Sequence, residues 1–416
     1  IMKHSIRATW ASSSYTLTLL LIMFIDGVGM SLVLPLIGDL FSTGPNSIIA
    51  ANTPSWLSYF YYGGSLACFS GAMIIGAAAL GQLSDQKGRK YSLYLSLIGA
   101  IIGYLICAFA IYISAPILFL SGRVIDGLTA GSIPVAQAML TDVDGQQNKI
   151  TSIGKVMFAL TSGYMFGPII ASVAFSSKQH LLSLPFILVA LLCLACISLL
   201  SLIPDTSQME EKKTRLDLTI ALRQIKALLV MPNIRLGLLI FFLFQCAWTL
   251  FYQCLPKLAL PVINLYGGNA SLVMAEVGIG MCFAFCLVVP KVQTLSTKRV
   301  VFYCFLLFTL ASATLLTLSV NFFSFQVLST LMAILYAVGY SAMLAFLVSI
   351  SDDHQRGLIF GSIASICAIS ATVTALLGST IISINYNLLI LVLFVTSLVA
   401  LVLFSKMSRE TVANTA

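Results

Sequence analysis

Twelve long apolar runs are the feature that most constrains this chain. To within a few residues they cover 15–40, 56–83, 92–113, 116–141, 150–175, 182–203, 235–260, 270–290, 300–319, 322–350, 357–380 and 385–405. A helix needs about 20 apolar residues to cross the hydrocarbon core of a bilayer. Only 9% of the residues are charged, against about 25% in a soluble domain. The runs also lack the alternation of β-barrel strands. The sequence therefore predicts an all-α membrane protein with twelve transmembrane helices.

The longest polar stretch divides the runs into six plus six. It extends from Pro204 to Asn233, so we expect an N-terminal bundle over 1–203, a cytoplasmic linker over 204–234 and a C-terminal bundle over 235–416. Within the linker, apolar residues recur at helical spacing at Leu218, Leu222, Ile225 and Leu229. Such a pattern predicts an amphipathic helix along the membrane surface.

Basic residues predict how the chain is oriented. Nineteen of the 22 Lys and Arg residues fall in alternate segments between the runs, and the exceptions are Arg123, Lys178 and Lys257. Because Lys and Arg collect in cytoplasmic loops, we expect both termini in the cytoplasm, in a bacterial inner membrane. The net charge of +8 then reflects topology and contact with the bilayer, and nucleic acid is not an expected partner.

Enzyme and metal chemistry find little support in the sequence. The three histidines lie in loops or termini, and the ten cysteines all fall inside apolar runs, where cysteine acts as a small hydrophobe. A Gly-rich phosphate loop and a nucleophile–base arrangement are both missing. We expect neither an enzyme nor a cofactor or metal, with a proton gradient as the energy source.

The two halves resemble each other weakly. An acidic turn, a glutamine and a base recur in the segments 138–149 and 345–357, at corresponding places in the fourth and tenth runs. Duplication of a six-helix unit, with a binding site between the copies, is a plan that many transporters use. The repeat predicts two pseudo-symmetric six-helix bundles.

The loop between the second and third runs holds the most specific motif. Gly81, Asp85, Gly88, Arg89 and neighbouring residues resemble the loop signature of the major facilitator superfamily. We expect Gly81 to allow close helix approach, Gly88 to allow a tight turn and Asp85 to face a cation or a helix N-terminus. The resemblance implies the major facilitator fold, with this loop as a latch between conformations.

The first run carries a carboxylate near the middle of the bilayer. Asp26 is followed by Gly27, Gly29 and Pro35, which resembles the first-span motif of twelve-span drug–proton antiporters, including tetracycline exporters. An intramembrane carboxylate is costly and is a functional candidate by default. Asp26 is therefore the predicted proton site; the alternative is a structural carboxylate held by backbone or Arg contacts.

The fourth run adds two more charges. On one continuous helix, Arg123, Asp126 and Gln137 share a stripe that would line an aqueous cavity, and Arg123 resembles the family's arginine in this span. Residues three apart on a helix can pair locally. Two interpretations stay open: a self-neutralised Arg123–Asp126 pair, or a proton-coupling cluster of both residues with Asp26.

The fifth run resembles the antiporter signature of the superfamily through Gly163, Gly167 and Pro168, with Ala171 and Ser172 in place of its last glycines. The resemblance favours export. Ordinary close packing of small residues is the alternative.

Polar aromatic residues mark the second half. Gln245, Trp248 and Tyr252 share one helix face, and Tyr336 and Tyr340 share another. Such faces predict a substrate cavity together with Gln137, although aromatic residues near span ends also form interfacial belts. Lys257 and Glu276 flank one outer loop, as an outer gate or as headgroup contacts.

The sequence thus predicts a proton-coupled transporter of small organic molecules that works by alternating access, as a monomer. Export by drug or metabolite antiport with protons is the first hypothesis. The alternatives are an uptake symporter for a nutrient, such as an amino acid or an organic-acid siderophore, and a non-transporting membrane sensor.

Overall fold

The computed structural model describes residues 2–42, 44, 46–144, 149–175, 182–203, 223, 226, 229, 231–263, 267–292, 295–317, 321–351 and 353–413. These residues form helices and connecting loops, without a strand among them. The first half contains α1 (Met2–Leu40), α2 (Ser55–Lys87), α3 (Arg89–Tyr112), α4 (Pro116–Leu128), α5 (Ser132–Asp144), α6 (Lys149–Phe175) and α7 (Leu184–Leu202). The second half contains α9 (Pro232–Ile263), α10 (Gly267–Phe283), η3 (Ala284–Val288), α11 (Val289–Val292), α12 (Thr297–Thr317), α13 (Phe322–Ser349), α14 (Asp353–Ile384) and α15 (Tyr386–Ala413).

Eleven helical segments within the described residues are long and apolar enough to cross a membrane. The remaining predicted span, 116–141, is divided into α4 and α5, each 13 residues long. The all-α membrane fold predicted from the sequence is therefore confirmed, with one crossing broken.

The break between α4 and α5 has a local cause. The Thr129 hydroxyl donates to the carbonyl oxygens of Ile125 and Asp126, at 3.0 and 3.2 Å. Pro134 lacks the N–H that would bond the carbonyl of Ala130 in a continuous helix. The predicted stripe over the fourth run is therefore wrong as one helix face, because Arg123 and Asp126 belong to α4 and Gln137 belongs to α5.

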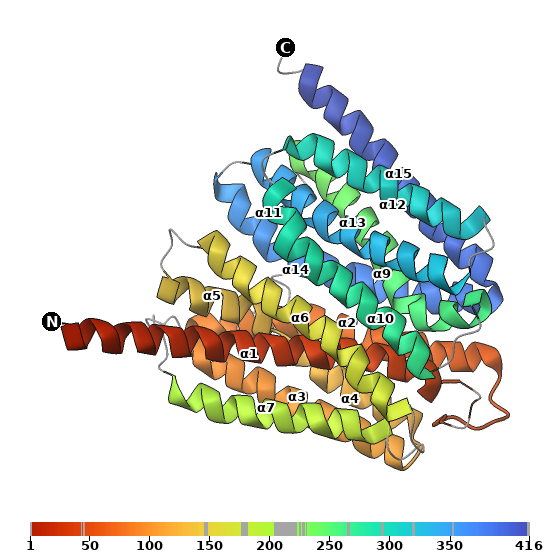
Figure 1. The fold of residues 1–416 in the computed structure, drawn as a ribbon, viewed down its shortest axis with the longest axis horizontal. Coiled ribbons are helices and arrows are strands. Elements are labelled where there is room, and N and C mark those ends of the chain that lie inside the picture. The colour runs from red at the N-terminus through yellow and green to blue at the C-terminus, as the bar shows by residue number, and fades with distance from the viewer. Residues whose placement is uncertain are drawn as a thin grey trace.

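The helices of each half pack mainly on one another. In the first half α1 packs on α6, and α3 lies against α4 and α7; in the second half α15 packs on α9 and α12. The halves meet where α2 packs on α14 and α6 packs on α10, as can be followed in Figure 1. Most of the predicted surface helix over 218–229 lies outside the described residues.

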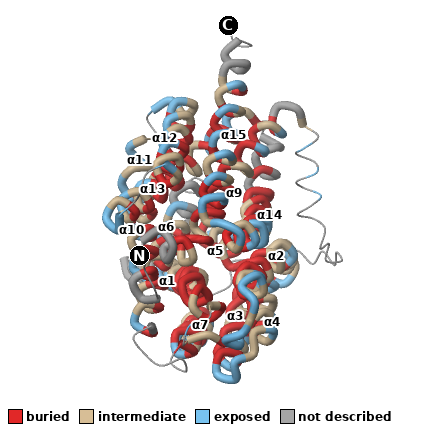
Figure 2. The backbone as a smooth tube through the Cα atoms, turned by 90° about the vertical axis from the view of Figure 1, so that its right-hand side faces the viewer, coloured by how far each residue is buried: buried red, intermediate tan, exposed pale blue. Residues whose placement is uncertain are grey.

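Large apolar side chains are exposed along many helices. Buried and exposed stretches alternate along the tube in Figure 2, and the exposed residues include Leu17, Ile117, Phe323 and Ile384, each at least 69% accessible. Apolar surface on this scale needs a nonaqueous partner. In this fold the partner is lipid.

Candidate functional site

Asp26 lies near the middle of the apolar segment Tyr15–Leu40 of α1. Its Oδ2 accepts a hydrogen bond of 2.6 Å from the hydroxyl of Ser132. Ser132 is the first residue of α5, so the carboxylate lies at the N-terminal end of the second piece of the broken crossing, where the helix dipole favours negative charge. The sequence analysis missed Ser132, because its role depends on the break.

Arg123 and Asp126 form a separate, buried ion pair on α4. Arg123 Nη1 and Asp126 Oδ2 are 2.6 Å apart, and the side chains are 3% and 7% exposed. The guanidinium also lies 4.3 Å from the ring centroid of Phe69 on α2. Within the described residues Arg123 Nε has no hydrogen-bond partner. Asp126 is thus neutralised by a neighbour on its own helix, whereas Asp26 receives a neutral hydroxyl.

Tyr104 of α3 completes this polar group. A Cβ at Gly29 of α1 would overlap its hydroxyl, and a Cβ at the preceding residue, Gly103, would meet Asp126. The Tyr104 hydroxyl therefore packs on α1 three residues after Asp26. Tyr104 was not predicted, although a hydroxyl inside an apolar run could have marked it.

The glycines of the fifth run hold α6 against α1. A Cβ at Gly163 would meet the backbone of Phe24 and Val28, and one at Gly167 would meet Ser31. The Ser31 hydroxyl lies 3.3 Å from the carbonyl oxygen of Gly163. Pro168 lies inside α6, which continues without a break to Phe175. The motif therefore packs directly beside Asp26, while its role in antiport stays a prediction.

Five predicted cavity residues form one aromatic cluster in the second half, which comprises Gln245, Trp248, Tyr252, Tyr336 and Tyr340. The rings of Trp248 and Tyr336 stack at 4.3 Å and those of Trp248 and Tyr252 at 5.4 Å. Tyr336 donates a hydrogen bond of 2.9 Å to Gln245 Oε1. Trp248 and Tyr336 are 4% and 7% exposed, so they do not form an interfacial belt.

Tyr164 of α6 lies where α6 packs between α1 and α10. Its hydroxyl lies 3.8 Å from the sulfur of Met30 on α1, and a Cβ at Gly278 of α10 would meet the backbone of Tyr164 and Met165. Nothing in the sequence distinguished Tyr164 from packing residues. Gln137, by contrast, lies half-buried on α5 and shares no described contact with the cluster.

The predicted latch is built differently from expectation. Gly88 adopts φ 102° between α2 and α3, as the predicted tight turn requires. Arg89 Nε pairs with Asp142 Oδ2 of α5 at 2.6 Å, a contact that the sequence did not reveal. The expected close approach at Gly81 is wrong, because a Cβ there would meet nothing within 4 Å. Asp85 is exposed, with no ion pair among the described residues.

Lys257 joins the halves at the opposite end of the helices. It lies 3.3 Å from the Phe41 carbonyl oxygen and over the rings of Tyr59 and Tyr62, at 5.3 and 5.4 Å. The Tyr62 hydroxyl also donates to the Gln253 carbonyl. Glu276 is not part of this contact; its Oε1 accepts a bond of 2.7 Å from Gln326.

The fold and these contacts define a two-bundle membrane transporter, and comparison with known proteins agrees. Residues 19–293 match the family model described as Major Facilitator Superfamily. The chain belongs to this superfamily of transporters.

Curated relatives cover less of the chain. A class B tetracycline resistance protein of Escherichia coli is 31% identical over 180 residues, which are 43% of this chain and 41% of the relative. A class H tetracycline resistance protein of Pasteurella multocida is 30% identical over 173 residues, 42% of this chain and 40% of the relative. The chain thus matches about two fifths of the length of these relatives.

Solved structures match almost the whole fold. The inward open xylose transporter of E. coli has a TM-score of 0.74 at 14% identity, covering 95% of this chain and 96% of that chain. The human organic anion transporter MFSD10 has a TM-score of 0.72 at 16% identity, covering 94% and 99%. These likenesses concern the fold alone.

Proposed function

We propose that the protein is a proton-coupled exporter of small organic molecules. The observation that carries this proposal is the position of Asp26, a mid-span carboxylate bonded to the Ser132 hydroxyl at the start of α5. The tetracycline resistance proteins among its relatives support export, since removal of the drug would supply resistance.

The two carboxylates would have different tasks. Asp126 already has a cation 2.6 Å away, so gaining a proton would leave the buried Arg123 charge uncompensated, which is costly. Asp26 carries no such penalty, because its described partner is a hydroxyl that can donate or accept. Asp26 would therefore exchange the proton, while the Arg123–Asp126 pair keeps the first half in one arrangement.

The aromatic cluster would receive the substrate. Stacked rings bind planar organic groups, and the Gln245–Tyr336 pair supplies a directional polar contact. Substrate and proton would then act from opposite halves on one site, and rocking of the halves would expose it to each side in turn. The distribution of basic residues supports a cytoplasmic location for both termini, and the proposed working unit is a monomer in a bacterial inner membrane.

Uptake of an organic acid is the competing hypothesis. It would use Arg123 and Lys257 to attract a carboxylate. Both groups already have partners: Arg123 is paired with Asp126, and Lys257 lies against Phe41 O and two rings. This engagement favours export.

Flux measurement in proteoliposomes tests the proposal. The chain is reconstituted with a panel of tetracyclines, other planar drugs and amino acids, and an imposed proton gradient drives transport. Asp26→Asn should abolish proton-driven flux and leave thermal stability close to that of the parent. The matched control Glu276→Gln removes a carboxylate whose described hydrogen bond lies within the second half, and it should retain flux. Normal proton-driven flux in Asp26→Asn would contradict the proposed proton site.

Direction is read in the same system. If substrate accumulates inside the proteoliposomes against its own concentration gradient while protons leave, the two move in opposite directions, and this exchange supports export. Movement of proton and substrate in the same direction would identify a symporter. Absence of saturable flux for every compound that stabilises the protein would favour a sensor.

A further inference from the structure

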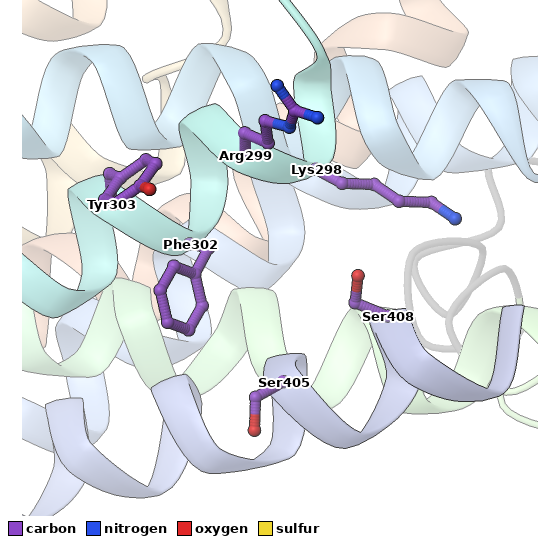
Figure 3. Close-up of a pocket in the computed structure, with 6 residues that line it drawn as sticks. All are labelled: Lys298, Arg299, Phe302, Tyr303, Ser405 and Ser408. Atoms are coloured by element: carbon purple, nitrogen blue, oxygen red, sulfur yellow. The ribbon is translucent and has the colours of Figure 1, made fainter. Parts of the chain in front are cut away.

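A basic cavity lies on the flank of the second half, away from the residues of the proposed transport site. It has a volume of about 280 Å³ and opens between the start of α12 and the last turns of α15, as Figure 3 shows. Its lining consists of Lys298, Arg299, Phe302, Tyr303, Ser405 and Ser408. Two cations and two hydroxyl-bearing serines around one space form a set suited to an oxyanion.

The start of α3 in the first half carries a similar pair of basic residues, and there both of them have partners within the protein. α3 begins with Arg89 and Lys90, with Tyr94 four residues after the second base, as α12 begins with Lys298 and Arg299 before Tyr303. Arg89 pairs with Asp142. Lys90 donates to the carbonyl oxygens of Ser201 and Ile203, at 3.2 and 2.5 Å, where α7 ends and leaves carbonyls unpaired.

Neither kind of partner is found for Lys298 and Arg299 among the described residues of the second half. α15 continues beyond Ser408 to Ala413, so its carbonyls at the cavity lie inside a helix rather than at its end. When Gln146 is matched with Gln355, Ser351 takes the place of Asp142. The ion pairs found among the described residues lie elsewhere. Lys298 and Arg299 line the cavity, and neither belongs to an ion pair among the residues that the structure describes.

The surroundings indicate a lipid rather than a soluble anion. Below the cavity, α12 exposes Tyr303, Leu307 and Leu310, which are 58%, 46% and 53% accessible and share one helix face. α15 exposes Val399 and Val402 at 41% and 43%. Acyl chains would lie along these faces while the polar head reaches the bases. Basic pockets between transmembrane helices commonly hold anionic headgroups.

We infer that this cavity binds the phosphate of an anionic phospholipid from the leaflet that we propose to be cytoplasmic. Lys298 and Arg299 contact the phosphate oxygens. The Ser405 hydroxyl donates to the Val402 carbonyl oxygen at 2.8 Å, so its lone pairs remain to accept from a hydroxyl of the headgroup. Phe302 and Tyr303 cover the glycerol region. The inference depends on the position of the helices in the membrane and not on the direction or substrate of transport.

The first experiment separates lipid from soluble anion. The full chain is purified in a neutral detergent, stripped of lipid, and titrated with phosphatidylglycerol, phosphatidylcholine or glycerol phosphate while its melting temperature is recorded. A specific ligand stabilises the folded state by mass action. We expect phosphatidylglycerol to raise the melting temperature well above either control. An equal rise with phosphatidylcholine, or with glycerol phosphate, would overturn the inference of an anionic lipid site.

Variants then locate the site. Lys298→Gln/Arg299→Gln should weaken the phosphatidylglycerol response about tenfold or more, since each base near anionic lipid contributes about a fivefold factor. Lys226→Gln/Arg235→Gln removes one exposed Lys and one exposed Arg from elsewhere, and should leave the response unchanged. Equal losses in both pairs would show that only overall charge matters, and would overturn the site.

A third variant changes shape without changing charge. Ser405→Leu fills the cavity from α15 and keeps both bases, so it should also weaken the phosphatidylglycerol response. Its melting temperature in phosphatidylcholine verifies that it is folded; if it is not, Ser408→Leu takes its place. An unchanged lipid response in a folded, filled variant would mean that the cavity is not the binding site.

Discussion

Ser132 donates a hydrogen bond of 2.6 Å to Asp26, across 106 positions of sequence. The bond connects the middle of the first crossing to the first residue of α5. A hydroxyl that starts a half-helix in the membrane interior therefore meets the carboxylate that we propose to carry the proton. Substitution of Ser132 and substitution of Asp26 therefore test the same hydrogen bond from its two ends.

Ser132→Ala should lower proton-driven flux about tenfold, because a hydrogen bond to a charged group contributes about 1.5–3 kcal/mol. Ser132→Thr keeps a hydroxyl and should restore most of the flux. Initial rates in proteoliposomes measure both. Ser121→Ala on α4 removes an exposed hydroxyl bonded to its own helix and is the control. If the Ala and Thr variants lose flux equally, the hydroxyl is not what matters.

Arg123→Met should destabilise the fold by about 3–5 kcal/mol, because it leaves the Asp126 carboxylate buried without its cation. The double variant Arg123→Met/Asp126→Leu removes both charges and should recover much of the loss. Thermal denaturation in detergent, monitored by the fraction of protein that stays monodisperse, ranks the variants by stability. Arg235→Met changes an exposed arginine and should have little effect. A double variant less stable than Arg123→Met would contradict the neutralised-pair interpretation.

Trp248→Ala should weaken substrate binding about two- to tenfold, because it removes the ring that stacks on both Tyr336 and Tyr252; aromatic pairs contribute about 0.5–1.5 kcal/mol beyond burial. Trp248→Phe should lose less. The concentration dependence of flux reports the change. Trp56→Ala alters a tryptophan that is 64% exposed, and it is expected to leave the concentration dependence as in the parent.

The Arg89–Asp142 pair should matter more for turnover than for stability. Its side chains are 23% and 27% exposed, and pairs this open to solvent contribute about 0–1 kcal/mol. Asp142→Asn should thus melt close to the parent temperature while changing the turnover rate. The exchanged pair Arg89→Asp/Asp142→Arg should restore turnover in part. A large fall in melting temperature with unchanged turnover would assign the pair to structure alone.

The apolar runs were sufficient to predict where the helices lie, because the bilayer sets their length. They could not reveal the break at Thr129–Gly131, since small residues such as those of 127–132 also occur inside unbroken membrane helices. Only the Thr129 hydroxyl and Pro134 marked it, and both residues also occur inside unbroken membrane helices. Ser132 therefore escaped notice, although Asp26 beside it did not.

The site was predicted in part for a related reason. Charged residues stand out in an apolar chain, so Asp26, Arg123 and Asp126 were recognised from sequence. Tyr104 and Tyr164 were not recognised, because a tyrosine in a membrane helix serves packing as readily as polar contact. The partners of Lys90 are backbone carbonyls, which no side-chain pattern can disclose.

The broken crossing has a mechanical consequence. α5 is 13 residues long, about 20 Å at the helical rise, and its first residue bonds Asp26 while its residue Asp142 bonds Arg89. Residues 129–131 separate α5 from α4 as helices, so neither of these two bonds passes through the Arg123–Asp126 pair on α4. If Asp26 exchanges the proton as we propose, α5 would connect that event in the bilayer interior to the loop that carries Arg89.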